Sequence, residues 1–132
     1  MAIIEYKNLT IIRKKGDIPD VPFLKIKETI LDKNYNLSII FCTPDESRIR
    51  NKTYRDKNYP TNILSFPLDK NEGEIYISLS SARRDAKKFG YSYQKFLHLL
   101  IIHGLLHLKG HAHGSTMEKL EDNYLQKFFR GA

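Results

Sequence analysis

Two kinds of hydrophobic periodicity follow one another along the chain, and together they predict alternating strands and helices. Short apolar runs rich in Ile, Tyr, Thr and Phe are typical of strands. They occupy residues 3–13, 37–42, 63–66 and 74–79. The first run is interrupted near Asn8, and the turn-forming residues 69–73 between the last two runs indicate a hairpin.

The other elements are predicted to be helices, at residues 23–31, 44–54, 82–89, 93–109 and 115–130. Most of them carry apolar side chains at helical spacing, whereas the helix at residues 82–89 is polar. Thr43, Pro44 and Glu46 are typical of a capped helix start, because Thr43 can cap, Pro suits the first turn and Glu46 completes a capping box. Gly90 and Gly110 are typical stops after the third and fourth helices.

The helix expected at residues 93–109 is apolar on nearly all sides, which indicates a central, buried position. The chain has 132 residues, enough for one domain with a core and hardly enough for two. No internal repeat or linker interrupts it. We therefore predict an α/β fold. It is a single compact domain, residues 1–132, with a small mixed sheet of about four strands and helices around the buried C-terminal helix.

Composition indicates a folded protein of the cytoplasm. Hydrophobic residues make up 41% and charged residues 28% of the chain, which are ordinary values for a globular protein. No apolar stretch approaches the roughly 18–20 residues that span a bilayer, and residues 1–6 show no secretory signal. The single cysteine, Cys42, cannot form an internal disulfide, which fits a reducing compartment.

The net charge of the chain indicates which classes of binding partner to expect. Lys and Arg number 22 against 15 Asp and Glu, which gives a net charge of +7. Such a surface attracts polyanions, either nucleic acid or an anionic membrane face. Basic proteins without such partners are also common, so the charge alone does not choose between them.

The strongest chemical signal is a group of histidines. All five lie within residues 98–113, and His103 and His107 are four apart on one face of the predicted helix. Gly110 then ends the helix and His113 can fold back, with His111 as a rival third ligand. Three neutral imidazoles leave a fourth tetrahedral position open for water, as in catalytic metal sites.

Two other interpretations of these histidines are weaker. Burying His103 and His107 as unrelated core residues would require independent hydrogen-bond partners for both rings. His98 stands apart and is read as an ordinary structural histidine. The spacing also matches the zinc-protease pattern HExxHxxGxxH, but Gly104 occupies the position of the glutamate that acts as general base. A protease is therefore disfavoured.

The same residues resemble the YbeY family of bacterial rRNA-maturation endoribonucleases. Residues 103–113 (HGLLHLKGHAH) resemble its HGxLHLxGYDH signature. Residues 51–55 (NKTYR) and 61–67 (TNILSFP) resemble its N-x-x-Y-R and TDVLSFP segments, and residues 73–77 (GEIYI) resemble its GDI-type strand. The similarity covers about residues 37–125, in the family's order.

The resemblance implies a metal site and a catalytic cleft. His103, His107 and His113 would bind one metal ion, zinc or another divalent metal, and belong to the catalytic set with Arg55. Arg55 would reach the same cleft and hold a phosphate, although the sequence alone favours a solvated loop arginine. Ser65 would offer a hydroxyl at the cleft or merely pack there.

Three positions depart from the family pattern. His111 and Ala112 replace the Tyr and Asp before the third histidine, and Asn62 replaces the usual Asp. Ala112 removes a carboxylate that supports a turn or a ligand, and Asn62 cannot accept a proton. His111 can compensate in part by a hydrogen bond or proton transfer. These losses leave the general base and the metal preference open.

The expected function is zinc-dependent cleavage of single-stranded rRNA, in which metal-activated water attacks the phosphodiester. In the family this serves 3′-end maturation of small-subunit rRNA and ribosome quality control, so the small subunit and its associated proteins are the expected partners, with no membrane. Tyr54, Tyr59 and Tyr91 are available for base stacking, or are ordinary core or rim residues. The alternatives are a metal-dependent hydrolase of a peptide or small phosphoester, and a non-catalytic ribosome-associated RNA-binding module.

Overall fold

The computed structural model describes residues 2–129, and its elements alternate as the sequence predicts. The strands are β1 (Ala2–Tyr6), β2 (Leu9–Arg13), β3 (Asn36–Cys42), β4 (Ile63–Asp69) and β5 (Glu72–Ser78). The helices are α1 (Phe23–Ile30), α2 (Pro44–Arg55), α3 (Leu79–Phe89), α4 (Tyr93–Leu108) and α5 (Ser115–Phe128). The end of the helix expected at residues 115–130 lies partly outside the described residues, because Arg130 is not described.

The strands form one mixed sheet in the order β1-β2-β3-β5-β4. The three inner strands β2, β3 and β5 are parallel, and the two outer strands pair antiparallel with their neighbours. The predicted α/β class and mixed sheet are therefore confirmed, as is the hairpin of β4 and β5. Pro67 lies in β4, an outer strand that has a neighbouring strand on one side only. Proline lacks a backbone N–H and is tolerated in such a strand, because its open side forms no hydrogen bonds with another strand.

The sheet has five strands where about four were predicted, because residues 3–13 form a hairpin instead of one strand. Tyr6 pairs with Leu9, so Lys7 and Asn8 make a two-residue turn. Asn8 has a φ of 63°, a left-handed conformation that asparagine tolerates well. The interruption expected near Asn8 is thus a tight turn that divides the run into two strands.

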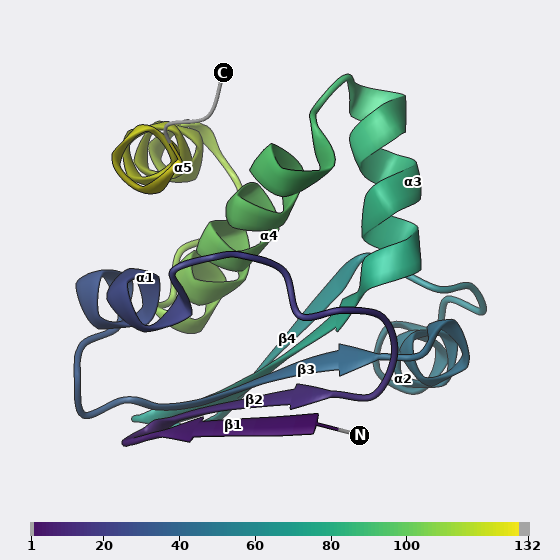
Figure 1. The fold of residues 1–132 in the computed structure, drawn as a ribbon, viewed down its shortest axis with the longest axis horizontal. Helices are drawn as coiled ribbons and strands as arrows, with labels where there is room; N and C mark the ends of the chain where they lie inside the picture. Colours follow the sequence, from purple (N-terminus) through teal and green to yellow (C-terminus); the bar gives the residue numbers. More distant parts are fainter. Residues whose placement is uncertain (1, 130–132) are drawn as a thin grey trace.

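Helices cover the two faces of the sheet unequally (Figure 1). On one face Ile75 and Ile77 join the main core with α1, α3 and α4. On the other face Tyr76 belongs to a smaller cluster with Leu64. Of the described helices, α2 packs on this side, where the guanidinium of Arg50 lies 3.9 Å from the centre of the Tyr76 ring.

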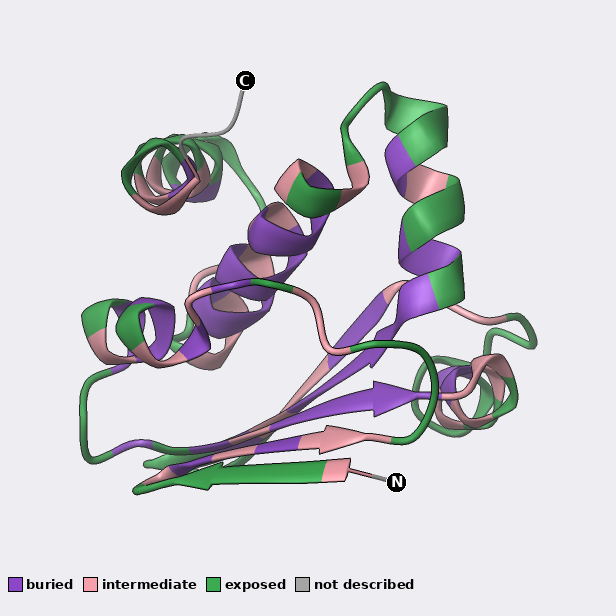
Figure 2. Ribbon diagram, viewed as in Figure 1, coloured by how far each residue is buried: buried purple, intermediate pink, exposed green. Residues whose placement is uncertain are grey.

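The central position predicted for the apolar helix is confirmed, because α4 is buried along most of its length (Figure 2). It lies between the sheet and the flanking helices, with α5 packed on it. Among the described residues no helix combines the length and the apolar character needed to cross a bilayer. The C-terminal end of α4 and the adjoining part of β4 position the candidate site.

Candidate functional site

Three histidines come together at the C-terminal end of α4. His103 and His107 project from its last turns, and the chain then turns at Gly110, whose φ is 106°. This turn returns His113 to the same place. The ring centres lie 4.7 Å apart for His103 and His107, 4.9 Å for His103 and His113, and 4.7 Å for His107 and His113.

The spacing of the ring nitrogens fits a single metal ion. One nitrogen from each of the three rings lies within 4.8 Å of the others. The Nε2 atoms of His107 and His113 are 3.2 Å apart. Two nitrogens bound at about 2.0–2.1 Å to one tetrahedral zinc ion would lie about 3.3–3.4 Å apart. Three imidazoles also form the donor set of a catalytic zinc site, so the residues present fit this metal.

The other two histidines lie outside this cluster. His111 is half-buried, and its backbone N–H donates to the carbonyl oxygen of Leu106. The structure thus brings His113, and not His111, to the pair on α4. His98 is buried, with Nδ1 2.8 Å from the carbonyl oxygen of Gln94 and its ring against Phe129, as expected of a structural histidine.

A cavity of about 170 Å³ opens beside the three rings. Its lining consists of Arg55, Thr61, Asn62, Ile63, Ser65, His103, His107 and His113. Arg55 comes from the last turn of α2 and lines this cavity, so it lies on a helix and not in a loop, but it is solvent-exposed, as the sequence alone favours. The hydroxyl of Ser65 lies 3.4 Å from the carbonyl oxygen of Gly104, at the junction of β4 and α4.

The electrostatic environment favours neutral imidazole at His107. Burial lowers the pKa of His107, and the positive charges of His103, His113 and Arg55 lower it further. The effect of Arg55 on the pKa of His107 means that its charge lies close to the rings. Neutral imidazole is the form that binds metals.

Gly104 explains why the zinc-protease glutamate is missing. A Cβ at this position would lie 2.8 Å from Cδ1 of Ile63, 3.0 Å from Cδ1 of Ile75 and 3.2 Å from Oγ of Ser65. The backbone of α4 therefore lies directly against β4 and β5, and a glutamate side chain has no room between them. The helix reaches the sheet closely enough to hold its histidines beside Ser65 because this residue lacks a side chain.

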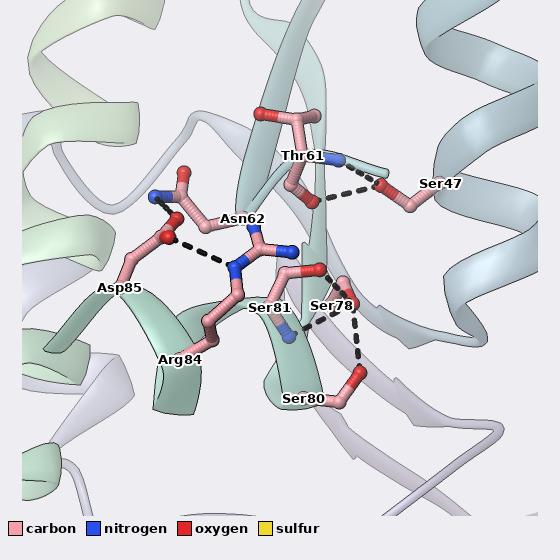
Figure 3. A network of polar contacts seen from close by, with 8 residues as sticks. All are labelled: Ser47, Thr61, Asn62, Ser78, Ser80, Ser81, Arg84 and Asp85. Atoms are coloured by element: carbon pink, nitrogen blue, oxygen red, sulfur yellow. Dashed lines mark hydrogen bonds and ion pairs between the residues drawn. The ribbon is translucent and has the colours of Figure 1, made fainter. Parts of the chain in front are cut away.

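The loop between α2 and β4 is fixed by polar contacts that the sequence did not reveal. Ser47 donates to the carbonyl oxygen of Thr61 at 2.8 Å and accepts from its N–H at 3.0 Å (Figure 3). Asn51 donates to the carbonyl oxygen of Tyr59 at 2.9 Å. The loop therefore has two anchors on α2, and its end at Thr61 forms part of the cavity wall.

Two carboxylates support the site from outside its lining. Nδ2 of Asn62 donates to Asp85 at 2.9 Å, and Asp85 also accepts from Arg84 at 3.2 Å (Figure 3). Nδ1 of His103 lies 3.1 Å from the carboxylate of Glu121 on α5. A role for Glu121 is not predicted from the sequence, although its position is a signal: it is an acid on the apolar stripe of a helix, four residues from both Met117 and Leu125.

The tyrosines considered for base stacking lie on the surface and do not line the cavity. Tyr54 packs against Phe66 with ring centres 4.9 Å apart, and Tyr91 packs against Phe96 at 5.7 Å. Tyr59 is exposed in the loop between α2 and β4. Of the three, Tyr54 is the one directly next in sequence to a residue that lines the cavity, Arg55.

Comparison with known proteins gives consistent matches. A family model described as Endoribonuclease YbeY matches residues 16–129. A protein named Endoribonuclease YbeY from Aster yellows witches'-broom phytoplasma (strain AYWB) is 35% identical over 119 residues, covering 80% of this chain and 78% of the relative. One of the same name from Aquifex aeolicus (strain VF5) is 39% identical over 106 residues, covering 71% of each.

A solved structure shows the same fold. The solution structure of a protein from Thermotoga maritima is similar, with a TM-score of 0.64 and 27% identity, over 89% of this chain and 87% of that protein.

Proposed function

The chain belongs to the endoribonuclease YbeY family, a family of hydrolytic nucleases, and from this premise we propose that it is a zinc-dependent endoribonuclease of single-stranded rRNA. The proposed role is 3′-end maturation of small-subunit rRNA and ribosome quality control in the cytoplasm. Residues 1–132 act as one catalytic domain in this proposal. One observation carries it: three imidazoles and a guanidinium line one small cavity.

The proposed metal ligands are His103, His107 and His113. When bound to three neutral imidazoles, a zinc ion acidifies water and polarises a phosphoryl oxygen. Each ring must present one nitrogen to the ion, and the site achieves this by taking two rings from one helix face and the third from the turn that follows.

Arg55 is the proposed phosphate-binding group. Its guanidinium is permanently charged and presents paired donors that match two phosphate oxygens. In the cavity it would orient the scissile phosphodiester and offset the negative charge that grows as water oxygen bonds to phosphorus and the P–O bond breaks. Asn62 cannot act as the general base, since it carries an amide and already donates to Asp85.

Surface charge and the lining of the site favour RNA over the other substrates. A volume of about 170 Å³ admits a phosphodiester group, and the rest of an RNA chain must lie on the surface. The net charge of +7 suits a polyanion there. A peptidase also lacks the glutamate that Gly104 excludes. Association with the ribosomal small subunit follows from the proposed substrate.

The test compares zinc-loaded wild type with His107→Ala and Arg55→Ala on a precursor of small-subunit rRNA. His111→Ala is the matched control, because it removes a neighbouring histidine outside the cluster. We expect His107→Ala to lose zinc and cleavage together, and Arg55→Ala to keep zinc but cleave at least about 100-fold more slowly, as for loss of one charge-stabilising group.

Two results would decide against the proposal. If wild type binds zinc and leaves every rRNA substrate intact while hydrolysing a small phosphodiester, the substrate is misassigned. If it binds rRNA with zinc and hydrolyses nothing, the protein is a binding module whose metal has a structural role.

A further inference from the structure

A half-buried acid on the last helix, Glu121, has no role in the function proposed above. Glu121 lies on the face of α5 that packs against α4, between the buried side chains of Met117 and Leu125. Its side chain is only 15% exposed. Burying a carboxylate among apolar side chains costs free energy unless it gains a specific partner.

The partner of Glu121 is one of the three clustered histidines. Oε1 of Glu121 lies 3.1 Å from Nδ1 of His103. A carboxylate can only accept a hydrogen bond, so Nδ1 carries the proton and donates it. This leaves Nε2 of His103 without a proton and free to act as a ligand.

The same contact fixes the direction of the ring. His103 is held from α5 on one side while its other face meets His107 and His113, with ring centres 4.7 Å and 4.9 Å away. Without the carboxylate, neither the tautomer nor the rotation of the ring would be set by a partner. In metal sites of other proteins, such outer carboxylates orient histidine ligands and strengthen metal binding.

We propose that Glu121 is a positioning residue that holds His103 in the Nδ1–H tautomer and so raises the affinity of the three-histidine site for zinc. This inference rests on the metal site of the proposed function. It also assigns a role to α5, which contributes none of the residues that line the cavity.

The decisive variant is Glu121→Leu. Leucine suits the apolar stripe between Met117 and Leu125 and favours helix, so the metal-free variant should be at least as stable as wild type. Leucine cannot accept a hydrogen bond, so zinc affinity should fall about 10–100-fold. A purely structural residue would not give equal stability together with weaker zinc binding.

Glu118→Leu is the matched control, because it makes the same substitution at an exposed position one turn earlier on α5. Zinc affinity is measured for each protein by competition with a chromogenic chelator, and the stability of the metal-free protein by urea unfolding. Glu121→Gln keeps an oxygen that can accept from Nδ1 and should recover most of the affinity.

A second readout needs no metal. Long-range ¹H–¹⁵N correlation spectra of the metal-free protein should show His103 of wild type protonated at Nδ1 when the ring is neutral, and should show that preference lost in Glu121→Leu.

Three results are informative in different ways. Weaker zinc binding with the change of tautomer supports the role of Glu121. Wild-type affinity in Glu121→Leu, or an unchanged tautomer, overturns that role but leaves the proposed nuclease intact. Failure of wild type itself to bind zinc overturns the metal site, and this inference with it.

Discussion

At the scale of single residues, Gly104 links packing to chemistry. The absence of its side chain lets α4 lie against β4 and β5, and this contact sets where His103 and His107 stand relative to Ser65. A one-carbon addition there tests how tightly the site depends on helix–sheet packing.

Gly104→Ala should destabilise the fold. The added Cβ would meet Ile63 at 2.8 Å and Ile75 at 3.0 Å, and overpacking of this kind costs about 1–3 kcal/mol, against a gain of about 1 kcal/mol in helix propensity. We expect a net loss of up to about 2 kcal/mol in urea unfolding. Because Ile63→Val removes the contacting Cδ1, it should partly rescue the variant. Equal effects of Gly104→Ala with and without Ile63→Val would contradict this contact.

Cys42 is expected to be inert in the folded protein. It is 2% exposed, and its thiol donates to the carbonyl oxygen of Ile77. Burial, with the nearby charge of Glu46, raises the pKa of the Cys42 thiol to about 11. Thiol reagents at about pH 8 should modify the protein only as fast as it unfolds. Rapid modification of the native protein would show that this part of the sheet is open to solvent.

The same pKa predicts a loss of stability in alkali. The folded state holds the proton more tightly than the unfolded state, whose thiol ionises near pH 9.0. The stabilisation is therefore complete below about pH 9 and is lost as the pH rises toward about 11, by at most about 3 kcal/mol. Urea unfolding at several pH values should show a shallower alkaline decline in Cys42→Ala than in wild type.

At the scale of elements, the loop between α2 and β4 depends on the helix that precedes it. Ser47 is buried and satisfies both backbone groups of Thr61, while Asn51 holds Tyr59. These contacts place Thr61 and Asn62 at the cavity, opposite the histidines. The side chains that hold this wall of the cavity in place therefore belong to α2.

Ser47→Ala should loosen that wall. Two backbone groups of Thr61 would lose their partner, which costs about 1–3 kcal/mol when the groups stay buried. We expect faster hydrogen exchange at the Thr61 N–H and a matching loss in urea unfolding. Thr53→Ala is the control, since its hydroxyl bonds to Ile49 on the exposed part of the same helix. Similar effects from both variants would mean that the loop is not anchored by Ser47.

Most elements followed from local pattern, and the exceptions have identifiable causes. Thr43 caps α2 through the N–H of Glu46 at 3.1 Å, and Gly90 ends α3 in a left-handed conformation, as their positions in the sequence predict. The interruption expected near Asn8 is a full turn between two strands, which local pattern did not separate because the residues on both sides favour strands equally. The strand predicted to close at Pro67 continues to Asp69, because an edge strand tolerates proline.

At the scale of the whole molecule, the net charge of +7 predicts that single-stranded RNA binds in a strongly salt-dependent way. Binding measured by fluorescence anisotropy in the cleavage-defective His107→Ala protein should weaken linearly on a log–log plot against salt. Removing one phosphate contact with Arg55→Gln should reduce the slope by about 0.7.

Arg13→Gln gives the matched control for this slope. Arg13 lies on β2, separated from β4 by β3 and β5, and its guanidinium donates to the carbonyl oxygen of Gly16. Arg13→Gln should leave the salt dependence of RNA binding unchanged if RNA binds along the surface around the cavity. Equal changes from Arg13 and Arg55 would indicate diffuse attraction to the whole basic surface.

The sequence by itself determined the α/β class, most element boundaries and the approach of His103 to His107, because these depend on periodicity, capping and spacing within one segment. Gly110 ends the helix and His113 follows after a short interval, so the sequence also predicted that a third imidazole can join the pair. The family resemblance implied that Arg55 and Ser65 lie at the cleft, but local pattern did not, and the tertiary structure shows Arg55, Asn62 and Ser65 lining one cavity. The tertiary structure alone brought Glu121 to His103. These groups come from different elements, and their meeting depends on how closely α4 packs against β4 and α5, which no local pattern encodes.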